Sequence, residues 1–491
     1  MKRIILVAVA AATCLVSQAQ TETEKVRSTV SKANIEGHVY FLASDELRGR
    51  ETGKPEIDIA AAYLANTLRR YSVKPVPGLG GGYYQEVPFV KTSAATRRSF
   101  SLEQFSTDKI VTVEAANINY DGPVVFLNYG TEADFKAADV KGKLVLTKAG
   151  MEGKTDPNAA IMAGVEKRKL ASQYGAVGLV EWYTASENLW SQLAHYFNED
   201  KLALKNESQQ SSLFPHCWVL DADGNQAKAS EGQKALKGSM QVEGVNVSTL
   251  YSRNVIGMVE GTDPVLKNEF VIYSAHYDHV GVGKPNADGD SIYNGARDNA
   301  IGSVTVLSAA ENIARYPTKR SALFIFFTAE EKGLLGSKWY VEHPVLPLKQ
   351  MVYCFNSDNA SYNDTTKISV VGLGRTTAKD HIHSAAKEFG LQAIDDPAPE
   401  QGLFDRSDNV HFARKGVPAP TFSLGFTSFN EEVLKYYHQV TDNPDNLNYD
   451  YLTKFFRAYV LACRKIANDP KTPVWIKGDK YEPAAQKLYG K

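Results

Sequence analysis

The pattern of hydrophobic and polar residues predicts an α/β domain in the second half of the chain. Short, continuous apolar runs alternate there with segments of helical spacing. The expected strands are 270–275, 322–327, 351–355 and 368–371, and the expected helices are 303–314, 335–341 and 452–466. Continuous apolar runs are typical of parallel strands buried on both faces. The alternation therefore predicts a mostly parallel central sheet flanked by helices.

The first half of the chain changes in character near residue 100. Apolar residues between Ile57 and Tyr71 recur at helical spacing, and Pro55 stands near the start. Short β-like runs follow at 122–127, 141–146 and 175–180. We therefore expect a first segment of the α/β domain, a β-rich inserted domain, a second segment and a C-terminal tail. The expected bounds are 28–99, 100–250, 251–470 and 471–491.

Residues 1–19 have the pattern of an export signal peptide. A basic start precedes the apolar run Ile4–Val16, and small residues at Ser17 and Ala19 give a plausible cleavage site. The run is too short to span a bilayer, and no later stretch qualifies. The pattern predicts an exported protein, periplasmic or secreted. A lipoprotein anchor at Cys14 is the less favoured alternative, because apolar residues continue past it.

Composition and charge fit an ordinary soluble globular protein. The chain has 491 residues, 43% of them hydrophobic and 23% charged, and its formal net charge is −1. This length is typical of two or three domains. A nucleic-acid partner would call for a basic patch, so the charge argues against one. Removal of residues 1–19 leaves three cysteines, an odd number, and no spacing among them suggests a metal site.

Five side chains that commonly bind metals lie in the predicted α/β domain. They are His276, Asp298, Glu331, Asp358 and His438. Three carboxylates and two imidazoles suit two divalent ions that share one carboxylate. His276, Glu331 and Asp358 each follow an apolar run closely, and ligands of open α/β sheets gather at the carboxyl ends of strands. The set points to hydrolysis by a metal-bridged water.

Several short motifs surround these residues. In chain order they are Ala275-His-Tyr-Asp-His279, Ile292–Gly302, Thr328–Ser337, Asn356-Ser-Asp358, Arg406-Ser-Asp408 and Tyr437-His438. Together they resemble the co-catalytic di-zinc exopeptidase family, which includes bacterial leucyl aminopeptidase, glutamate carboxypeptidase and the transferrin-receptor ectodomain. The resemblance covers most of 35–470 outside the insert and implies a zinc exopeptidase fold, phosphorylase/hydrolase-like. Segments 140–146 and 174–178 resemble a protease-associated domain.

The resemblance implies a ligand set of two zinc ions. His276 and Asp358 would hold one ion, Glu331 and His438 would hold the other, and Asp298 would bridge them. The resemblance also implies a cis peptide bond between Asp298 and Asn299.

The resemblance further implies catalytic roles for three residues. Glu330 would be the general base that takes a proton from the bridging water and passes it to the leaving amine. A carboxylate within reach suffices for this, because a metal-bound water has a pKa near 7. Asp278 would hydrogen-bond the imidazole of His276 and fix its tautomer. Tyr437 would hydrogen-bond the tetrahedral oxyanion.

The chain departs from the family pattern at three places. Asn409 follows the Ser-Asp pair where His is frequent, Asn-Ala-Ser follows Asp358, and Arg297 stands at a position that is often acidic. None of these replaces a proposed ligand, but each could alter the pocket and its specificity. The other histidines, His279, His343, His381, His383 and His411, are interpreted as ordinary residues.

An aminopeptidase acting on peptides is the function that this pattern favours. Glu330 and Asp358 could bind the free amine of the substrate. A zinc carboxypeptidase is the nearer alternative, and it would need a cation for the substrate carboxylate, supplied by Arg406 or Arg297. A non-catalytic binding ectodomain is disfavoured because every ligand and the base are present. The insert supplies no ligand, so we expect it to form a separate lobe beside the cleft that limits access or contacts substrate.

Overall fold

The computed structural model describes residues 20–205, 213–233 and 235–490. The signal peptide predicted at 1–19 lies outside them. The chain forms two compact units: the first comprises the described residues up to Glu86 and from Ser252 onward, and the second is Val87–Tyr251. Within the described ranges no helix has the length and apolar character needed to cross a membrane.

The first unit is built on a large sheet whose centre is parallel. Its strands, in spatial order, are β18 (Gln392–Ile394), β17 (Lys367–Val371), β19 (Thr421–Leu424), β16 (Met351–Ser357), β12 (Phe270–His276), β15 (Ser321–Phe327), β11 (Val247–Val259) and β1 (Tyr84–Thr92). Strand β12 runs parallel to both β15 and β16, and β19 runs parallel to β16. Antiparallel pairs occur farther out, between β11 and β15 and between β17 and β19. The predicted mostly parallel sheet is confirmed.

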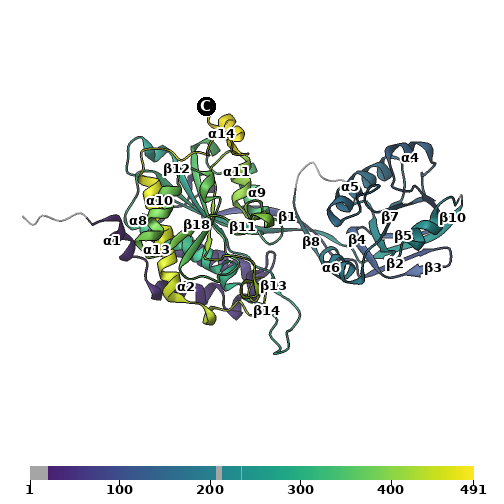
Figure 1. The fold of residues 1–491 in the computed structure, drawn as a ribbon, viewed down its shortest axis with the longest axis horizontal. Helices are drawn as coiled ribbons and strands as arrows, with labels where there is room; N and C mark the ends of the chain where they lie inside the picture. The colour runs from purple at the N-terminus through teal and green to yellow at the C-terminus, as the bar shows by residue number, and fades with distance from the viewer. Residues whose placement is uncertain (1–19, 206–212, 234, 491) are drawn as a thin grey trace, which may run out of the picture. The chain divides into compact units, whose positions relative to one another are not determined.

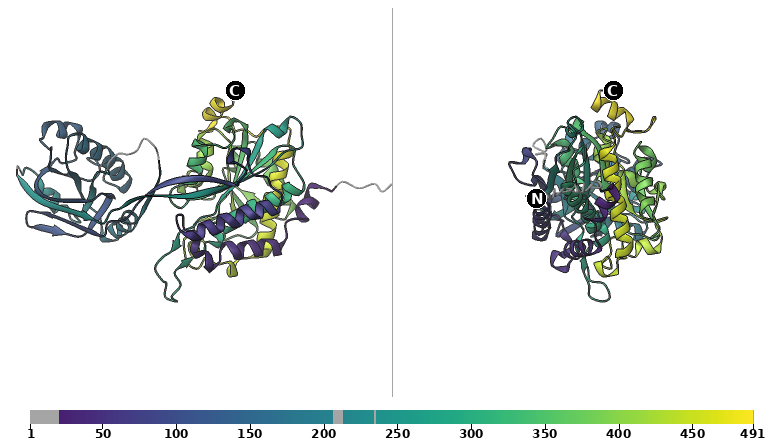
Figure 2. Two further views of the ribbon diagram at one scale, coloured as in Figure 1. Left: turned by 180° about the vertical axis from the view of Figure 1, so that it is seen from behind. Right: turned by 90° about the vertical axis from the view of Figure 1, so that its left-hand side faces the viewer.

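Helices cover both faces of this sheet (Figures 1 and 2). One layer contains α1 (Glu22–Arg27), α2 (Lys32–Leu42), α3 (Pro55–Arg70), α8 (Gly302–Arg315), α10 (Lys379–Glu388) and α13 (Tyr449–Asn468). The other contains α9 (Leu335–Glu342), α11 (Asn409–Arg414) and α14 (Glu482–Tyr489). Tyr273 of β12 packs in the first layer and its neighbour Ile272 in the second. Successive strand residues point to opposite faces, so burial on both sides explains the continuous apolar runs.

Smaller elements complete the first unit. Strands β13 (Gly281–Val282) and β14 (Ile292–Tyr293) form an antiparallel ribbon, and α12 (Glu431–Leu434) is a short helix. The segment after residue 470, expected as a tail, is packed into the unit. Trp475 is buried and donates its indole N–H to the carbonyl oxygen of Gly416 at 3.0 Å. Arg375 donates two hydrogen bonds to the carboxylate of Asp479, at 2.7 and 2.9 Å.

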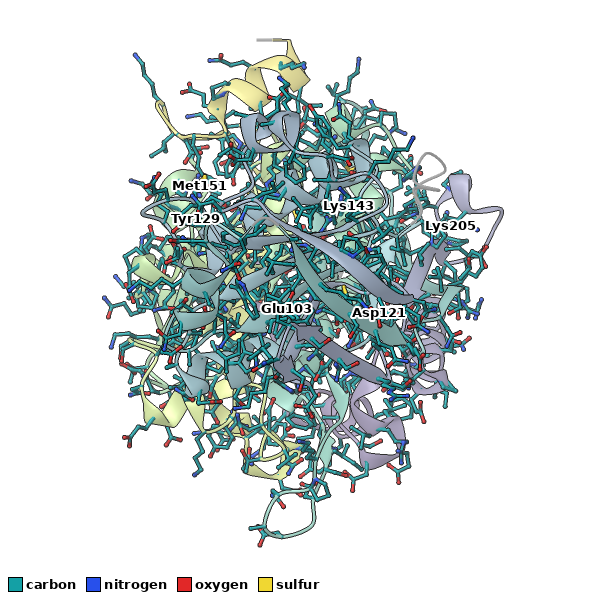
Figure 3. All side chains as sticks on the ribbon, turned by 90° about the vertical axis from the view of Figure 1, so that its right-hand side faces the viewer. Glu103, Asp121, Tyr129, Lys143, Met151 and Lys205 are labelled. Atoms are coloured by element: carbon teal, nitrogen blue, oxygen red, sulfur yellow. The ribbon has the colours of Figure 1, made fainter. Side chains whose placement is uncertain are left out.

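The second unit has its own sheet. The strand order is β3 (Phe105–Thr107), β2 (Arg97–Leu102), β10 (Leu236–Glu243), β5 (Ile118–Phe126), β6 (Leu144–Lys148), β7 (Gly178–Tyr183), β9 (His216–Leu220) and β4 (Ile110–Glu114). The four strands from β5 to β9 in this order are mutually parallel. Strand β8 (Lys201–Leu204) is instead the ninth strand of the other sheet. It pairs there with residues Phe89–Thr92 of β1, which also belong to the second unit. Acidic and basic side chains both lie on the surface of the unit, for example Glu103, Asp121 and Lys205 (Figure 3).

The second unit also contains helices, which the β-like pattern of the insert did not indicate. They are α4 (Glu132–Ala137), α5 (Pro157–Gln173), α6 (Glu187–Phe197) and α7 (Asn225–Ser230). Parallel strands need crossover connections, and a helix is the usual one. Helix α5 connects the neighbouring parallel strands β6 and β7 in this way.

A buried carboxylate organises the core of the second unit. Glu181 of β7 is fully buried, and its Oε2 accepts hydrogen bonds from Lys167 Nζ at 2.6 Å and Thr147 Oγ1 at 3.1 Å. Its Oε1 lies 2.8 Å from His216 Nε2 and accepts the indole N–H of Trp218 at 3.1 Å. Buried charges need such partners, because an unpaired buried carboxylate is costly.

Candidate metal centre

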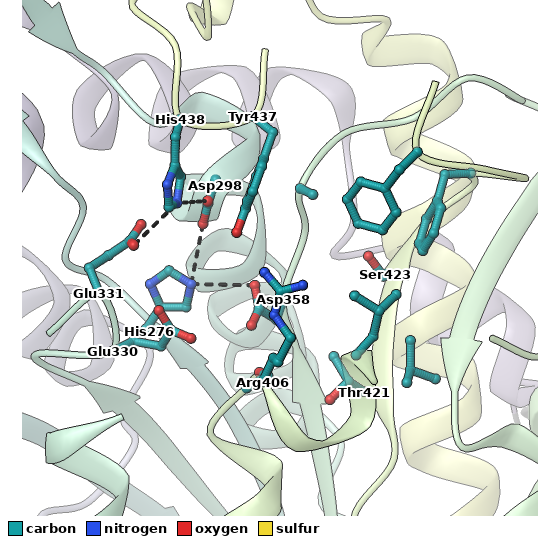
Figure 4. Close-up of a pocket in the computed structure, with 16 residues that line it drawn as sticks. His276, Asp298, Glu330, Glu331, Asp358, Arg406, Thr421, Ser423, Tyr437 and His438 are labelled. Carbon is teal, nitrogen blue, oxygen red and sulfur yellow. Dashed lines mark hydrogen bonds and ion pairs between the residues drawn. The ribbon is translucent and has the colours of Figure 1, made fainter. Parts of the chain in front are cut away.

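Three of the predicted donors stand at the carboxyl ends of three adjacent strands. His276 ends β12, Glu331 follows β15 and Asp358 follows β16. Because these strands are parallel neighbours, their ends lie at one edge of the sheet. The remaining donors come from the kinked helical turn Ala296–Ile301 before α8, which carries Asp298, and from the loop after α12, which carries His438. The fold thus brings together all five residues that the sequence analysis singled out (Figure 4).

Asp298 lies between the two imidazoles and presents a different oxygen to each. Its Oδ1 is 3.4 Å from His276 Nε2, and its Oδ2 is 3.2 Å from His438 Nε2. His276 Nε2 is also 3.4 Å from Asp358 Oδ1, and His438 Nε2 is 3.2 Å from Glu331 Oε2. The side chains therefore form two groups of donors that share one carboxylate.

These separations suit zinc. Two donor atoms about 2.0–2.1 Å from one tetrahedral zinc ion lie about 3.3 Å from each other. The four donor pairs measure 3.2–3.4 Å. The groups that could hold a metal ion among the described residues are His276 with Asp298 and Asp358, and Asp298 with Glu331, His438 and His279. Imidazole nitrogen and carboxylate oxygen are both common zinc ligands.

The electrostatics of the centre favour a bound cation. Burial alone would raise the pKa of Glu331, and the charge of Asp298 adds to this, but hydrogen bonds from His279 and His438 lower it to about 2. Burial disfavours the charged form of His438, yet hydrogen bonds to Asp298 and Glu331 raise its pKa to about 10. The carboxylates thus stay ionised and stabilise positive charge between them.

Glu330 lies beside the donors without belonging to either group. It lines the same pocket as His276, Asp298 and Asp358. Burial raises its pKa well above the usual range for glutamate, and the charges of Asp358 and Glu331 raise it further, against the opposite effect of His276. Glu330 is not one of the metal donors, and its proton affinity is raised. Both are properties of a general base.

Asp278 has a different role from the one expected. The Nδ1 atom of His276 lies 3.2 Å from the backbone carbonyl oxygen of Asp278 and 3.8 Å from its carboxylate, so the carbonyl is the hydrogen-bond acceptor. The carboxylate of Asp278 instead accepts the backbone N–H groups of Glu330 at 3.1 Å and Glu331 at 3.3 Å. Thr52 also donates to it, at 3.2 Å. Asp278 therefore positions the Glu330-Glu331 turn.

Tyr437 lines the pocket with its hydroxyl directed into it (Figure 4). Its ring stacks on the ring of His438, with centroids 4.2 Å apart. Burial, followed by the charges of Asp298 and Glu331, raises the pKa of its hydroxyl above the ordinary value. The hydroxyl thus stays protonated and can donate a hydrogen bond to an oxyanion.

The two arginines proposed as carboxylate clamps lie in different environments. Arg406 lines the pocket and is exposed. Arg297 is buried, pairs with Asp442 at 2.9 Å and stacks on the ring of Tyr436 at 3.7 Å. Its guanidinium is committed to these partners, so the suggestion of Arg297 as a substrate clamp was wrong.

His279 belongs to the site, although the sequence analysis treated it as an ordinary residue. It is fully buried, and its Nδ1 lies 2.8 Å from Glu331 Oε1. The signal that could have found it is its place in the same short motif as His276, three residues farther along the chain.

The predicted cis peptide bond between Asp298 and Asn299 is present.

Part of the pocket lining is apolar. It comprises Ala360, Val371, Leu403, Phe426 and Phe429, and Thr421 and Ser423 also line the pocket. The pocket has a volume of about 100 Å³. It can therefore take a small apolar group next to the metal donors.

Comparison with known proteins agrees with this arrangement. Aminopeptidase YwaD of Bacillus subtilis (strain 168) is 26% identical over 363 residues, which cover 72% of this chain and 69% of the relative. The probable leucine aminopeptidase 2 of Aspergillus oryzae is 25% identical over 393 residues, which cover 73% and 70%.

Solved structures share the fold. The aminopeptidase from Aneurinibacillus sp. strain AM-1 matches with a TM-score of 0.63 at 20% identity, covering 92% of this chain and 97% of that one. BSAP, a zinc aminopeptidase from Bacillus subtilis, matches with a TM-score of 0.52 at 20% identity, covering 90% and 97%. Residues 254–462 match the model of peptidase family M28. This segment contains all five metal donors, and the chain therefore carries a peptidase family M28 domain.

Proposed function

We propose that this protein is a zinc aminopeptidase that uses two zinc ions to remove N-terminal residues from peptides. The observation that carries the proposal is the position of Asp298, whose two oxygens face two different imidazoles at 3.4 and 3.2 Å. His276 and Asp358 would hold one ion, and Glu331 and His438 the other. The named aminopeptidases among the relatives and the family M28 match support the class of reaction.

Zinc would supply Lewis-acid polarisation of the scissile carbonyl and would acidify a bound water. The protein side chains supply proton transfer. Glu330 lines the pocket beside the donors without being one of them. Its carboxylate would take the proton from the attacking water and give it to the leaving amine. Tyr437 would donate its hydroxyl hydrogen to the oxyanion that forms on the carbonyl.

The charges of the pocket support recognition of a free amine. Glu330 and Asp358 are carboxylates that line it, and an N-terminal ammonium group pairs favourably with them. The apolar part of the lining, with Phe426 and Phe429, suits the side chain of an N-terminal residue. The export signal predicted at 1–19 supports a role outside the cytoplasm, which we include in the proposal.

A zinc carboxypeptidase is the second candidate, and Arg406 is the observation that favours it. Arg406 is an exposed cation in the lining of the same pocket. A guanidinium there could bind the C-terminal carboxylate of a peptide. Two carboxylates of the pocket lining, the donor Asp358 and the non-donor Glu330, against one cation, make amine recognition the better supported function.

One assay separates these functions. Purified protein would be given aminoacyl-anilides in one series and N-acylated peptides ending in glutamate in another, each with and without a chelator. Chelator-sensitive release of the anilide supports the aminopeptidase. Chelator-sensitive cleavage of only the N-acylated peptides supports the carboxypeptidase. Binding of peptides without turnover in either series, by protein that contains zinc, would favour a non-catalytic binding ectodomain.

A further inference from the structure

His279 contacts one oxygen of Glu331, and His438 contacts the other. Glu331 Oε1 lies 2.8 Å from His279 Nδ1, and Oε2 lies 3.2 Å from His438 Nε2. We propose that His279 is a positioning residue: it donates its Nδ1 hydrogen to Glu331, orients that carboxylate for zinc, and does not bind zinc itself. This inference rests on the zinc site of the proposed function.

The distances distinguish a hydrogen bond from shared ligation. Within each of the two donor groups, the paired nitrogen and oxygen atoms are 3.2–3.4 Å apart. Two ligands of one tetrahedral zinc ion lie about 3.3 Å apart. The separation of 2.8 Å between His279 and Glu331 is shorter and typical of an N–H···O hydrogen bond. His279 is near enough to the other donors to be a possible zinc ligand. Its short distance to Glu331 is what identifies it as a hydrogen-bond donor instead.

The chemistry of the pair assigns the proton. An ionised carboxylate only accepts hydrogen bonds, so the Nδ1 atom of His279 must carry hydrogen to bond Glu331. A nitrogen that carries hydrogen has no lone pair for a metal.

The surroundings hold the His279 ring in this orientation. The ring packs against Gly295, where an added Cβ atom would lie 2.6 Å from two of its carbon atoms. The backbone N–H of His279 donates to the carbonyl oxygen of Arg50 at 3.3 Å. Arg50 is fully buried and donates from its guanidinium to the carbonyl oxygens of Tyr277 at 2.8 Å and Gly295 at 3.0 Å. The guanidinium of Arg50 thus holds together the segments that contain Tyr277 and Gly295, on both sides of the ring.

The bond has a consequence for metal binding. A carboxylate held by a second partner reaches the metal already oriented, whereas a free one must be ordered when the metal binds. Loss of such a partner typically lowers metal affinity by about 10–100-fold. A residue that acts in this way changes zinc affinity more than it changes the fold of the zinc-free protein.

Three variants test the proposal. His279→Ala removes the donor, and His279→Asn retains an amide N–H at the place of Nδ1. His38→Ala is the matched control, because His38 is also buried in the first unit but bonds only the hydroxyls of Tyr63 and Tyr71, at 2.7 and 2.8 Å. Zinc affinity would be measured by competition with a chelator, and the stability of the zinc-free proteins by thermal unfolding.

We expect His279→Ala to bind one of its two zinc ions about 10–100-fold more weakly, and His279→Asn to recover most of that loss. His38→Ala should lose stability without loss of zinc affinity. Wild-type affinity in His279→Ala would overturn the proposal. So would the absence of one zinc ion, at saturating zinc, from both His279 variants, because that outcome would make His279 a ligand.

X-ray absorption of the wild-type protein keeps the proposal testable if the variants do not fold. We expect about one imidazole per zinc, from His276 and His438, whereas a third histidine ligand would raise the average by half. Wild-type protein that binds no zinc would contradict the proposed function as a whole. Zinc binding that does not depend on His279 would contradict the positioning role alone.

Discussion

Arg297 and Asp442 form a buried ion pair next to the shared donor Asp298. Nη1 of Arg297 lies 2.9 Å from Oδ1 of Asp442, and their side chains are 2% and 1% exposed. Asp442 also accepts the backbone N–H groups of Arg297 and Asp298, at 2.9 and 3.2 Å. The pair therefore anchors the loop that carries Asp298 to the segment that follows His438.

Replacement of Arg297 by methionine should destabilise the first unit strongly. Asp442 would stay buried without its cation, which typically costs about 3–5 kcal/mol. Lys32→Met is the control, because Lys32 pairs with Asp450 on the surface and such pairs contribute about 1 kcal/mol or less. Urea unfolding of both variants would measure this. An Arg297→Met protein as stable as wild type would show that the pair does not anchor the loop.

Replacement of Asp298 should remove zinc, because Asp298 belongs to both donor groups. We expect two zinc ions per chain in active protein, and loss of metal together with activity in Asp298→Ala, because both donor groups share this carboxylate. Metal analysis after gel filtration is the measurement. One zinc ion per chain at full activity would contradict the two-metal scheme.

Replacement of Glu330 by glutamine should separate catalysis from metal binding. The amide cannot accept the proton, so turnover should fall by a factor of about 10² or more while zinc stays bound. Glu331→Gln is the matched change at the next residue and should weaken zinc binding, because Glu331 is a donor. If the Glu330→Gln protein folded but bound no zinc, Glu330 would be a zinc ligand and not the general base.

The second unit should lose stability in acid through Glu181. Burial raises the pKa of this carboxyl group, but the hydrogen bonds and charges of His216 and Lys167 outweigh burial and lower it from 4.5 to about 2. A folded pKa below the unfolded one gives stability that is present above pH 4.5 and is lost as pH falls towards 2. The shift corresponds to roughly 3 kcal/mol.

Fluorescence can isolate this effect in the full chain. Trp182, Trp190 and Trp218 lie in the second unit, so Trp339→Phe and Trp475→Phe would leave only their signal. Urea midpoints would be compared between pH 6 and pH 3.5. We expect Glu181→Gln to flatten the acid dependence of this transition. An equally steep dependence in Glu181→Gln would assign the effect to other groups.

Deletion of the second unit should spare the metal site. All five donors and Glu330 lie in the first unit, and the chain leaves and re-enters that unit at Glu86 and Ser252. Joining these residues shortens a connection, and loop length has a small effect on closure entropy. We expect the folded deletion protein to bind zinc and cleave a small anilide. A folded deletion protein without zinc would show that the second unit is required for the site.

The local sequence determined the α/β architecture of the first unit and the identity of the donors. Runs such as 270–273 are apolar at every position because their strands are buried on both faces, and this constraint is visible without a structure. His276, Glu331 and Asp358 are predictable for the same reason, because each follows such a run at a strand end. The cis bond after Asp298 was predictable only through the family resemblance.

Helix α5 shows where the local pattern is insufficient. Its buried positions include Gly164 and Lys167 as well as Ala160 and Leu170, so no apolar stripe marks its inner face. Gly164 is next to the ring of His216, and Lys167 bonds Glu181. Residues far apart in sequence thus decide which face is buried.

The tertiary structure alone decided how the polar side chains of the site divide their roles. Asp278 turns its carboxylate to the backbone of Glu330 and Glu331, Arg297 turns to Asp442, and His279 turns to Glu331. Each of these partners is at least 50 residues away in the chain. The sequence by itself determined which groups could bind metal or carry protons. Which partner each group meets depends on rotamers and distances that exist only after the strands have been brought side by side.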